Sequence, residues 1–324
     1  MRLSPARLLI VAVPLVLVTG IALGSVALSP AAVWEGLTSA TSPHALIVRE
    51  LRVPRVLLAF LVGGSLGVSG AVLQAIVRNP LADPYLLGLS GGAGLGAVIA
   101  IALDAGAAWA VPASAFGGAL LAVTLVYRLA VVSGRRLDPR VLLLAGVVVG
   151  AFAAAVMSAV IVLSDAPRLR NAFLWLLGGF SAASWSALAI FAAYAAVPML
   201  LMVRSGRALD LLALGEETAQ HLGADPERTK RIVYVAASLL TAASVATCGI
   251  IGFVGLVVPH AMRRLGSPLH AALLPASFLG GGAFLVAADT MARTVMRPVE
   301  LPVGVVTALV GVPLFALLLR RSVA

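Results

Sequence analysis

The chain has 324 residues, of which 61% are hydrophobic and only 11% are charged. Soluble domains average about 45–50% apolar and about 25% charged residues, so this composition excludes an ordinary soluble protein and predicts an integral membrane protein. A net charge of +10 alone would suggest a nucleic-acid partner. Basic residues that flank membrane spans explain it instead, and we predict no nucleic-acid partner.

Windows without Asp, Glu, Lys or Arg mark the candidate spans, because a bilayer core of about 30 Å needs about 20 apolar helical residues. The first window resembles a signal peptide, but its apolar run exceeds the usual core of about 7–15 residues, so we interpret it as an uncleaved span. The seventh contains Gly249, Gly252, Gly255 and Pro259 and predicts one full helix followed by a shorter, broken one. The nine windows are 8–34, 56–77, 84–103, 105–127, 141–164, 171–203, 232–262, 265–288 and 301–319.

The distribution of basic residues favours ten spans over nine. Ten spans with a cytoplasmic N-terminus put 16 of the 23 basic residues inside, whereas nine spans put 14 there. We therefore predict an all-α membrane protein with ten transmembrane helices and both termini in the cytoplasm. The outer segments are then 29–55, 164–184 and 290–300, and the inner segments are 78–84, 133–140, 204–231 and 260–268.

Charged residues in the outer segments form two groups. Arg52 and Arg55 stand three apart at a predicted helix start, so both should point to one side near the membrane surface. Arg293 follows the ninth predicted span, four residues after Asp289, and the two are spaced for an ion pair. Glu300 is most simply a carboxylate at a helix start. For the arginines, anchoring at the membrane interface is the alternative to binding a partner.

The inner segment 78–84 predicts a tight turn. Its residues Arg78, Asn79, Pro80, Asp83 and Pro84 contain two pairs, Asn-Pro and Asp-Pro, that favour turn initiation. Pro84 also suits the first turn of the following helix. We interpret this turn as structural support, with contact to a partner protein as the alternative.

The longest inner segment, 204–231, holds ten of the charged residues. Good helix formers predict a helix over 210–223, followed by a new helix with Asp225 as its cap and Pro226 in its first turn. An ordinary solvated connector remains the alternative to a protein-binding element.

The sequence lacks the residues that ATP binding, an intrachain disulfide and a metal site require. The single lysine, Lys230, is followed by Arg231, so the phosphate-binding motif G-x-x-x-x-G-K-[ST] does not occur. If this protein takes part in ATP-driven transport, the ATPase must be a separate chain. The single cysteine, Cys248, excludes an intrachain disulfide. No pair among the histidines has the spacing of a metal site, and we predict neither a metal nor a cofactor bound by this chain.

Specific motifs resemble the permease family of ABC importers for ferric siderophores, haem and cobalamin. The resemblance runs from about residue 45 to the C-terminus. The motifs are Arg52-x-Pro54-Arg55, Gly70-Ala71-x-x-Gln74, Arg78-Asn79-Pro80-Leu81-Ala82-Asp83-Pro84, Leu87-Gly88, Leu214-Gly215-Glu216, Ala219, Leu222-Gly223, Gly252-Phe253-Val254-Gly255-Leu256-x-x-Pro259-His260 and Glu300-Leu301-Pro302-Val303-Gly304-x-x-Thr307.

The resemblance implies a type II ABC importer permease in a bacterial inner membrane. It implies one transmembrane domain over 1–324, an inverted repeat of spans 2–5 and 7–10, a homodimer, two ATPase subunits that bind ATP and Mg, and a periplasmic binding protein. Within the inner segment 204–231, the residues that match the family's ATPase-coupling loop are Leu214, Gly215, Glu216, Ala219, Leu222 and Gly223. Outside that segment, the residues that match the family's arginines for docking the binding protein are Arg52, Arg55 and Arg293.

Substrate identity is left open among haem, other iron chelates and cobalamin, with a slight preference for haem. An ion-coupled secondary transporter is the alternative mechanism, but it should carry ionisable residues at its span centres, and the predicted spans have essentially none. A membrane-embedded enzyme would need convergent acids, histidines or a nucleophile, and the predicted spans offer only scattered serines and threonines.

Overall fold

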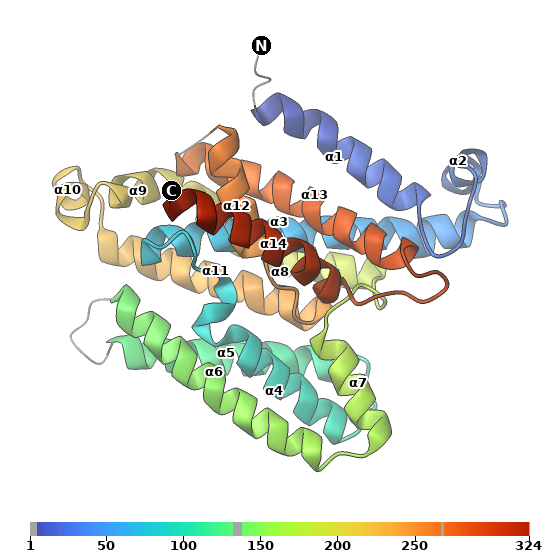
Figure 1. Ribbon diagram of the computed structural model, residues 1–324, viewed down its shortest axis with the longest axis horizontal. Helices are drawn as coiled ribbons and strands as arrows, with labels where there is room; N and C mark the ends of the chain where they lie inside the picture. Colours follow the sequence, from blue (N-terminus) through green and yellow to red (C-terminus); the bar gives the residue numbers. More distant parts are fainter. Residues whose placement is uncertain (1–4, 132–137, 267–268, 324) are drawn as a thin grey trace.

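A computed structural model describes residues 5–131, 138–266 and 269–323, and within these residues it contains helices and connecting segments but no strand (Figure 1). The elements are α1 (Pro5–Ala22), α2 (Pro30–Thr38), η1 (Leu46–Arg52), α3 (Val53–Val77), η2 (Pro84–Leu87), α4 (Leu89–Ala102), α5 (Ala110–Val131), α6 (Pro139–Val162), α7 (Ala166–Leu176), α8 (Trp185–Arg204), α9 (Gly206–Ala213), α10 (Glu216–His221), α11 (Pro226–Cys248), α12 (Val254–Leu265), α13 (His270–Thr294) and α14 (Val303–Val323). The all-α prediction is confirmed for this part of the chain. Parts of the predicted inner segments, 133–137 and 267–268, lie outside the described residues, as do the two chain ends.

Six helical segments are long and apolar enough to cross a membrane: Leu46–Val77, Ala110–Val131, Pro139–Val162, Trp185–Arg204, Pro226–Cys248 and His270–Thr294. Three shorter apolar helical stretches accompany them, at Leu9–Ala22, Leu89–Ala102 and Val303–Leu317. The remaining predicted span corresponds to α12, which has 12 residues and carries two arginines in its last turn. The chain is therefore a multi-pass membrane protein with at least six strong spans.

Helix boundaries refine the predicted windows. The seventh window divides as predicted, because α11 ends at Gly249, whose φ of +71° favours glycine. The first and sixth windows each hold a span and part of a predicted outer segment, 29–55 or 164–184, and the structure divides them accordingly. In the first, α1 ends at Ala22 and α2 begins at Pro30, where Ser29 accepts a capping hydrogen bond. In the sixth, α7 ends at Leu176 and α8 begins only at Trp185.

Helix α3 forms the centre of the bundle, and it packs against α1, α8, α11, α12 and α13. Small residues on α3 make this packing possible. A Cβ atom at Gly67 would overlap the carbonyl oxygen of Ser277 on α13, and one at Gly70 would overlap that of Gly255 on α12. Glycine therefore permits the close helix approach on which packing within a bilayer depends.

The bundle has two ends, which carry different short elements (Figure 1). Helices α9 and α10 lie at one end, termed here the α10 end. Helices α2 and α7 and the turn from α13 to α14 lie at the opposite end, termed the α2 end. Helices α4 to α7 gather on one side of the bundle, and α11 contacts this group through α4 and α5.

Candidate coupling surface and arginine cluster

The predicted coupling residues lie in α10 and its flanking turns. The predicted single helix over 210–223 is wrong, because two short helices, α9 and α10, occupy this stretch. They are separated at Gly215, whose φ of +113° is strained for any residue with a side chain. The N–H group of Ala219 donates to the Gly215 carbonyl over 2.9 Å, and Gly223, at φ +84°, follows the end of α10. The two glycines thus set the direction of α10.

Side-chain exposure on α10 is uneven. Ala219 is fully buried, whereas Leu214 and Leu222, on either side of the helix, are 64% and 57% exposed. Ala219 anchors α10 to the bundle, and the two leucines remain available for contact.

Glu216 joins three elements at the α10 end. Its carboxylate lies 2.8 Å from Nζ of Lys230 on α11 and 3.5 Å from a guanidinium nitrogen of Arg78 at the end of α3. Lys230 is only 3% exposed and also pairs with Glu227 over 3.1 Å. Asp225 accepts from the backbone N–H of Arg228, so the predicted cap of α11 is confirmed. Glu216 therefore connects α10 to both α3 and α11.

The turn 78–84 forms as predicted. Arg78 adopts a left-handed conformation that ends α3, and the Asn79 side chain accepts a hydrogen bond from the backbone of Leu81. Asp83 accepts one from the backbone of Tyr85, over 2.9 Å. Burial raises the pKa of Asp83 to about 6. The structure thus brings this turn and α10 together through Arg78, a proximity that the sequence analysis did not predict.

Gln74 fixes the turn to the bundle. Its amide nitrogen donates to the carbonyl oxygens of Ala82, Gly255 and Leu256, and its amide oxygen accepts from Arg263 over 2.6 Å. Gln74 is 3% exposed, so these bonds satisfy a buried polar group. Sequence reasoning identified Gln74 only as part of a motif and missed its structural role.

A second link joins α9 to α13. Asp210 accepts from the backbone N–H of His270 over 2.7 Å and lies 2.8 Å from Nδ1 of the same residue. These residues stand 60 positions apart, and no local pattern in the sequence indicates the pair. The α9–α10 unit is therefore attached at both ends, through Asp210 and through Glu216.

At the α2 end, two of the predicted docking arginines are buried. Arg52 is 5% exposed and donates to the carbonyl oxygens of Ile21 and Ala22 over 2.9 and 2.7 Å. Arg293 is 3% exposed and donates to those of Gly20 and Leu23 over 3.0 and 2.9 Å. Neither side chain is free at the surface, because both guanidinium groups satisfy carbonyl groups in and directly after the last turn of α1.

The third arginine, Arg55, sits between two carboxylates. It pairs with Asp289 and with Glu300, in each case over 2.9 Å. Asp289 is 1% exposed and also pairs with Arg293 over 2.9 Å, so the predicted Asp289–Arg293 ion pair is confirmed. Glu300, predicted to serve a helix start, instead binds Arg55 and keeps one third of its side chain exposed. We term Arg52, Arg55, Asp289, Arg293 and Glu300 the arginine cluster.

A cavity of about 480 Å³ opens beside this cluster. Arg55 and Glu300 contribute to its wall, together with Asn171 and Thr247. Within the described residues there is no group of three His, Cys, Asp or Glu side chains arranged to hold a metal ion.

The comparison with known proteins agrees with this architecture. The sequence pattern of the FecCD transport family matches residues 9–321. The chain belongs to the FecCD transport family. Among its FecCD relatives is the cobalamin import system permease protein BtuC of Halobacterium salinarum, 45% identical over 85% of this chain and 73% of the relative. The vitamin B12 import system permease protein BtuC of Klebsiella pneumoniae is 41% identical over 86% of this chain and 83% of the relative.

A solved structure extends the FecCD relationship to the fold. It is described as an inward-facing conformation of a metal-chelate type ABC transporter and aligns over 97% of both chains with a TM-score of 0.87 and 29% identity. The family resemblance predicted from the motifs is thereby confirmed.

Proposed function

We propose that this chain is the membrane-spanning permease subunit of an ATP-driven importer that moves cobalamin from the periplasm to the cytoplasm. The observation that carries this proposal is the 45% identity, over 85% of the chain, to a cobalamin import permease. The sequence analysis favours haem slightly, and we revise that preference because two relatives are named for cobalamin or vitamin B12.

Haem or another iron chelate is the second candidate substrate. It is supported by the fold similarity to a protein described as a metal-chelate type ABC transporter. The lower identity of that protein, 29% against 45%, places this candidate behind cobalamin.

The proposed architecture has ten spans, with both termini in the cytoplasm of a bacterial cell, and an inverted repeat of spans 2–5 and 7–10. The ten spans are α1, α3, α4, α5, α6, α8, α11, α12, α13 and α14. The six long apolar segments and the three shorter ones support nine of them. Two copies of this chain would form the permease, with two ATPase subunits at the α10 end and a periplasmic binding protein at the α2 end.

ATPase coupling is assigned to α10 and its flanks. The exposed Leu214 and Leu222 are suited to contact the ATPase. ATP and Mg would bind to that ATPase, because this chain contains no P-loop motif. Closure of the ATPase pair would move α10. The contacts of Glu216 with Lys230 and Arg78 would then carry that movement into the spans.

Docking of the binding protein is assigned to the α2 end, with Arg55 rather than Arg52 or Arg293 as the residue able to exchange partners. Glu300 is partly exposed, so an acidic residue of the docking protein could replace it at Arg55. Glu300→Gln should then raise the affinity for the binding protein at low salt, because Arg55 loses a competing carboxylate. Glu35→Gln, at another charge of the same end, is the control, and equal affinity in both variants would contradict this assignment.

Uptake in proteoliposomes tests the proposed function. The chain would be reconstituted with its ATPase and binding protein, and cobalamin, haem and a ferric siderophore would be supplied separately. We expect ATP-dependent accumulation of cobalamin. Accumulation of haem or the siderophore alone would select the second candidate. Uptake that follows an ion gradient without ATP would overturn the importer assignment in favour of an ion-coupled secondary transporter.

A further inference from the structure

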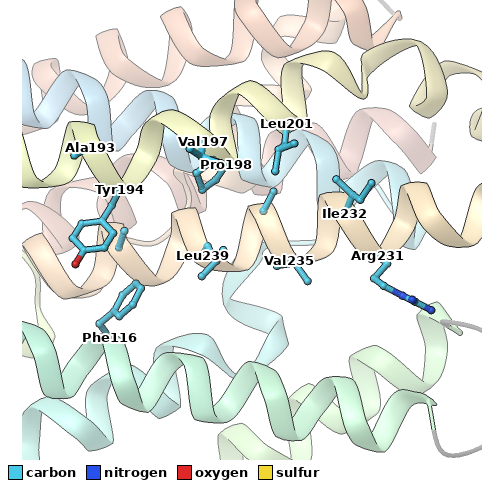
Figure 2. Close-up of a pocket in the computed structure, with 12 residues that line it drawn as sticks. Phe116, Ala193, Tyr194, Val197, Pro198, Leu201, Arg231, Ile232, Val235 and Leu239 are labelled. Atoms are coloured by element: carbon cyan, nitrogen blue, oxygen red, sulfur yellow. The ribbon is translucent and has the colours of Figure 1, made fainter.

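A groove of about 540 Å³ runs between α5, α8 and α11 (Figure 2). Its volume lies within the range of about 300–1,000 Å³ typical of small-molecule sites. All but one of the side chains that line it are apolar or aromatic, the exception being Arg231. None of these residues belongs to the coupling surface or the arginine cluster, so the proposed transport function does not account for the groove.

The groove is open toward the surroundings of the bundle. Val197 on α8 and Val235 on α11 line it, and they are 64% and 45% exposed. Both helices are among the segments long and apolar enough to cross a membrane. Where no other protein covers them, walls on these two helices would meet the acyl-chain region of the bilayer. Pro198, inside α8, lacks the N–H group of a regular helix position, and the small Ala236 and Ala243 leave space on α11.

The two ends of the groove differ in chemistry. At one end, the rings of Phe116 and Tyr194 pack with their centroids 5.8 Å apart (Figure 2). At the other end, Figure 2 shows the guanidinium of Arg231 extending beyond the apolar walls. Arg231 is exposed, and it has no ion pair within the described residues. It lies near the start of α11, the end of that helix nearest α10.

We propose that the groove binds one acyl chain of an anionic phospholipid, with Arg231 pairing with the headgroup. The apolar walls would hold the chain, and the unpaired cation stands where a headgroup of the leaflet at the α10 end would lie. Basic residues between membrane helices attract anionic headgroups in this way. The proposal requires the chain to lie in a membrane, but it does not depend on which substrate is transported.

Native mass spectrometry of the full-length chain tests the proposal. The protein would be held in micelles containing equal amounts of phosphatidylglycerol and phosphatidylcholine, and the lipids retained after gentle detergent removal would be counted. We expect the wild-type chain to retain phosphatidylglycerol preferentially. Arg231→Gln should reduce that preference about five-fold, as expected for one cation near a headgroup. Val235→Trp should fill the groove and reduce retention of both lipids.

Matched controls separate this site from general surface effects. Arg207→Gln removes an exposed arginine at the same end that does not line the groove, and Leu121→Trp adds bulk to a 62% exposed position of α5 outside it. Both should behave as wild type. If Val235→Trp does not fold, Val197→Trp fills the groove from the opposite wall.

Two results would overturn the lipid site. One is retention of phosphatidylglycerol by Arg231→Gln with an unchanged preference. The other is a groove-filling variant that keeps its lipids but changes from dimer to monomer, which would identify a second copy of the chain as the occupant.

Discussion

The two ends of the bundle use charge in opposite ways. At the α2 end, Arg52, Arg293 and Asp289 are each at most 5% exposed. Arg52 donates to carbonyl groups at the end of α1, and Arg293 donates to Asp289. At the α10 end, Arg78 and Glu216 are 52% and 37% exposed, and their ion pair is 3.5 Å long. Buried ion pairs hold one geometry because breaking them leaves a charge without a partner, whereas exposed pairs exchange readily. We therefore expect the α2 end to act as a rigid clamp and the α10 end, apart from the buried Lys230, to be displaced more readily.

The largest effect is expected from Asp289→Asn, which tests whether the buried charges stabilise the α2 end. This change removes the negative charge between Arg55 and Arg293 and leaves both guanidinium groups buried without it. We expect a loss of about 3–5 kcal/mol in the free energy of unfolding, measured as a large fall in melting temperature in detergent.

Asp104→Asn is the matched control, because Asp104 pairs with Arg168 at a side chain that is 81% exposed. It should leave the melting temperature nearly unchanged. A wild-type melting temperature for Asp289→Asn would show that the cluster does not depend on an ionised carboxylate, and the clamp description of the α2 end would then be wrong.

At the α10 end, Glu216→Ala should change coupling more than stability. It removes the carboxylate that joins α10 to the buried Lys230, but Lys230 keeps Glu227 as a partner, so the cost in stability is about 1–2 kcal/mol. We expect substrate uptake per ATP hydrolysed to fall while ATP hydrolysis continues. The neighbouring Glu217, for which no ion pair is found within the described residues, provides Glu217→Ala as the control. Equal coupling ratios in the two variants would remove Glu216 from the transmission path.

A smaller effect is expected from Arg78→Gln. The pair with Glu216 is exposed and long, so its loss should cost about 0.2–1 kcal/mol. Raising the salt concentration should reduce the difference between variant and wild type, because solvent ions screen exposed pairs. A salt-independent loss of several kcal/mol would place Arg78 with the buried charges and would abolish the distinction between the two ends.

Local features of this fold could be predicted from the sequence, and long-range features could not. Apolar length located α3, α5 and α6, and capping chemistry located the start of α11 at Asp225. Composition did not locate the end of the first helix, because the uncharged run continues past Ala22, where α1 ends. The pairing of residues on different helices depends on how those helices cross, and spacing carries no information about crossings.

The arginine cluster illustrates that limit. Arg55 and Glu300 stand 245 positions apart, and only the packing of α3 against α13 brings them together. The motif resemblance named Arg52, Arg55 and Arg293 together, and spacing predicted the Asp289–Arg293 pair, but neither placed Glu300 beside Arg55. The resemblance did not indicate that Arg52 and Arg293 would be directed inward, toward the carbonyl groups at the end of α1.

The smallest effect is expected from Asp83→Asn in the turn 78–84. Its effect on the melting temperature should depend on pH. The pKa of Asp83 is raised to about 6 by burial, above the value of about 3.9 in an unfolded chain. A carboxyl group whose pKa is raised on folding adds to the free energy of unfolding when it is protonated. This stabilisation is fully present below about pH 4 and is lost as the pH rises through 6. Asparagine keeps the side-chain oxygen that accepts from Tyr85 but does not ionise.

The melting temperature of Asp83→Asn should therefore equal or slightly exceed that of the wild-type chain at pH 7.5, and the difference should narrow at pH 5 and close below about pH 4. Asp83 is largely buried but keeps some contact with solvent. That contact reduces the cost of its charge below that of full burial, so we expect a small difference. Asp138→Asn, another helix cap, is the control and should show no such convergence. If the variant is instead less stable at pH 7.5 than at pH 5 relative to wild type, ionised Asp83 is stabilised by its surroundings, and the α10 end would then hold a fixed charge as the α2 end does.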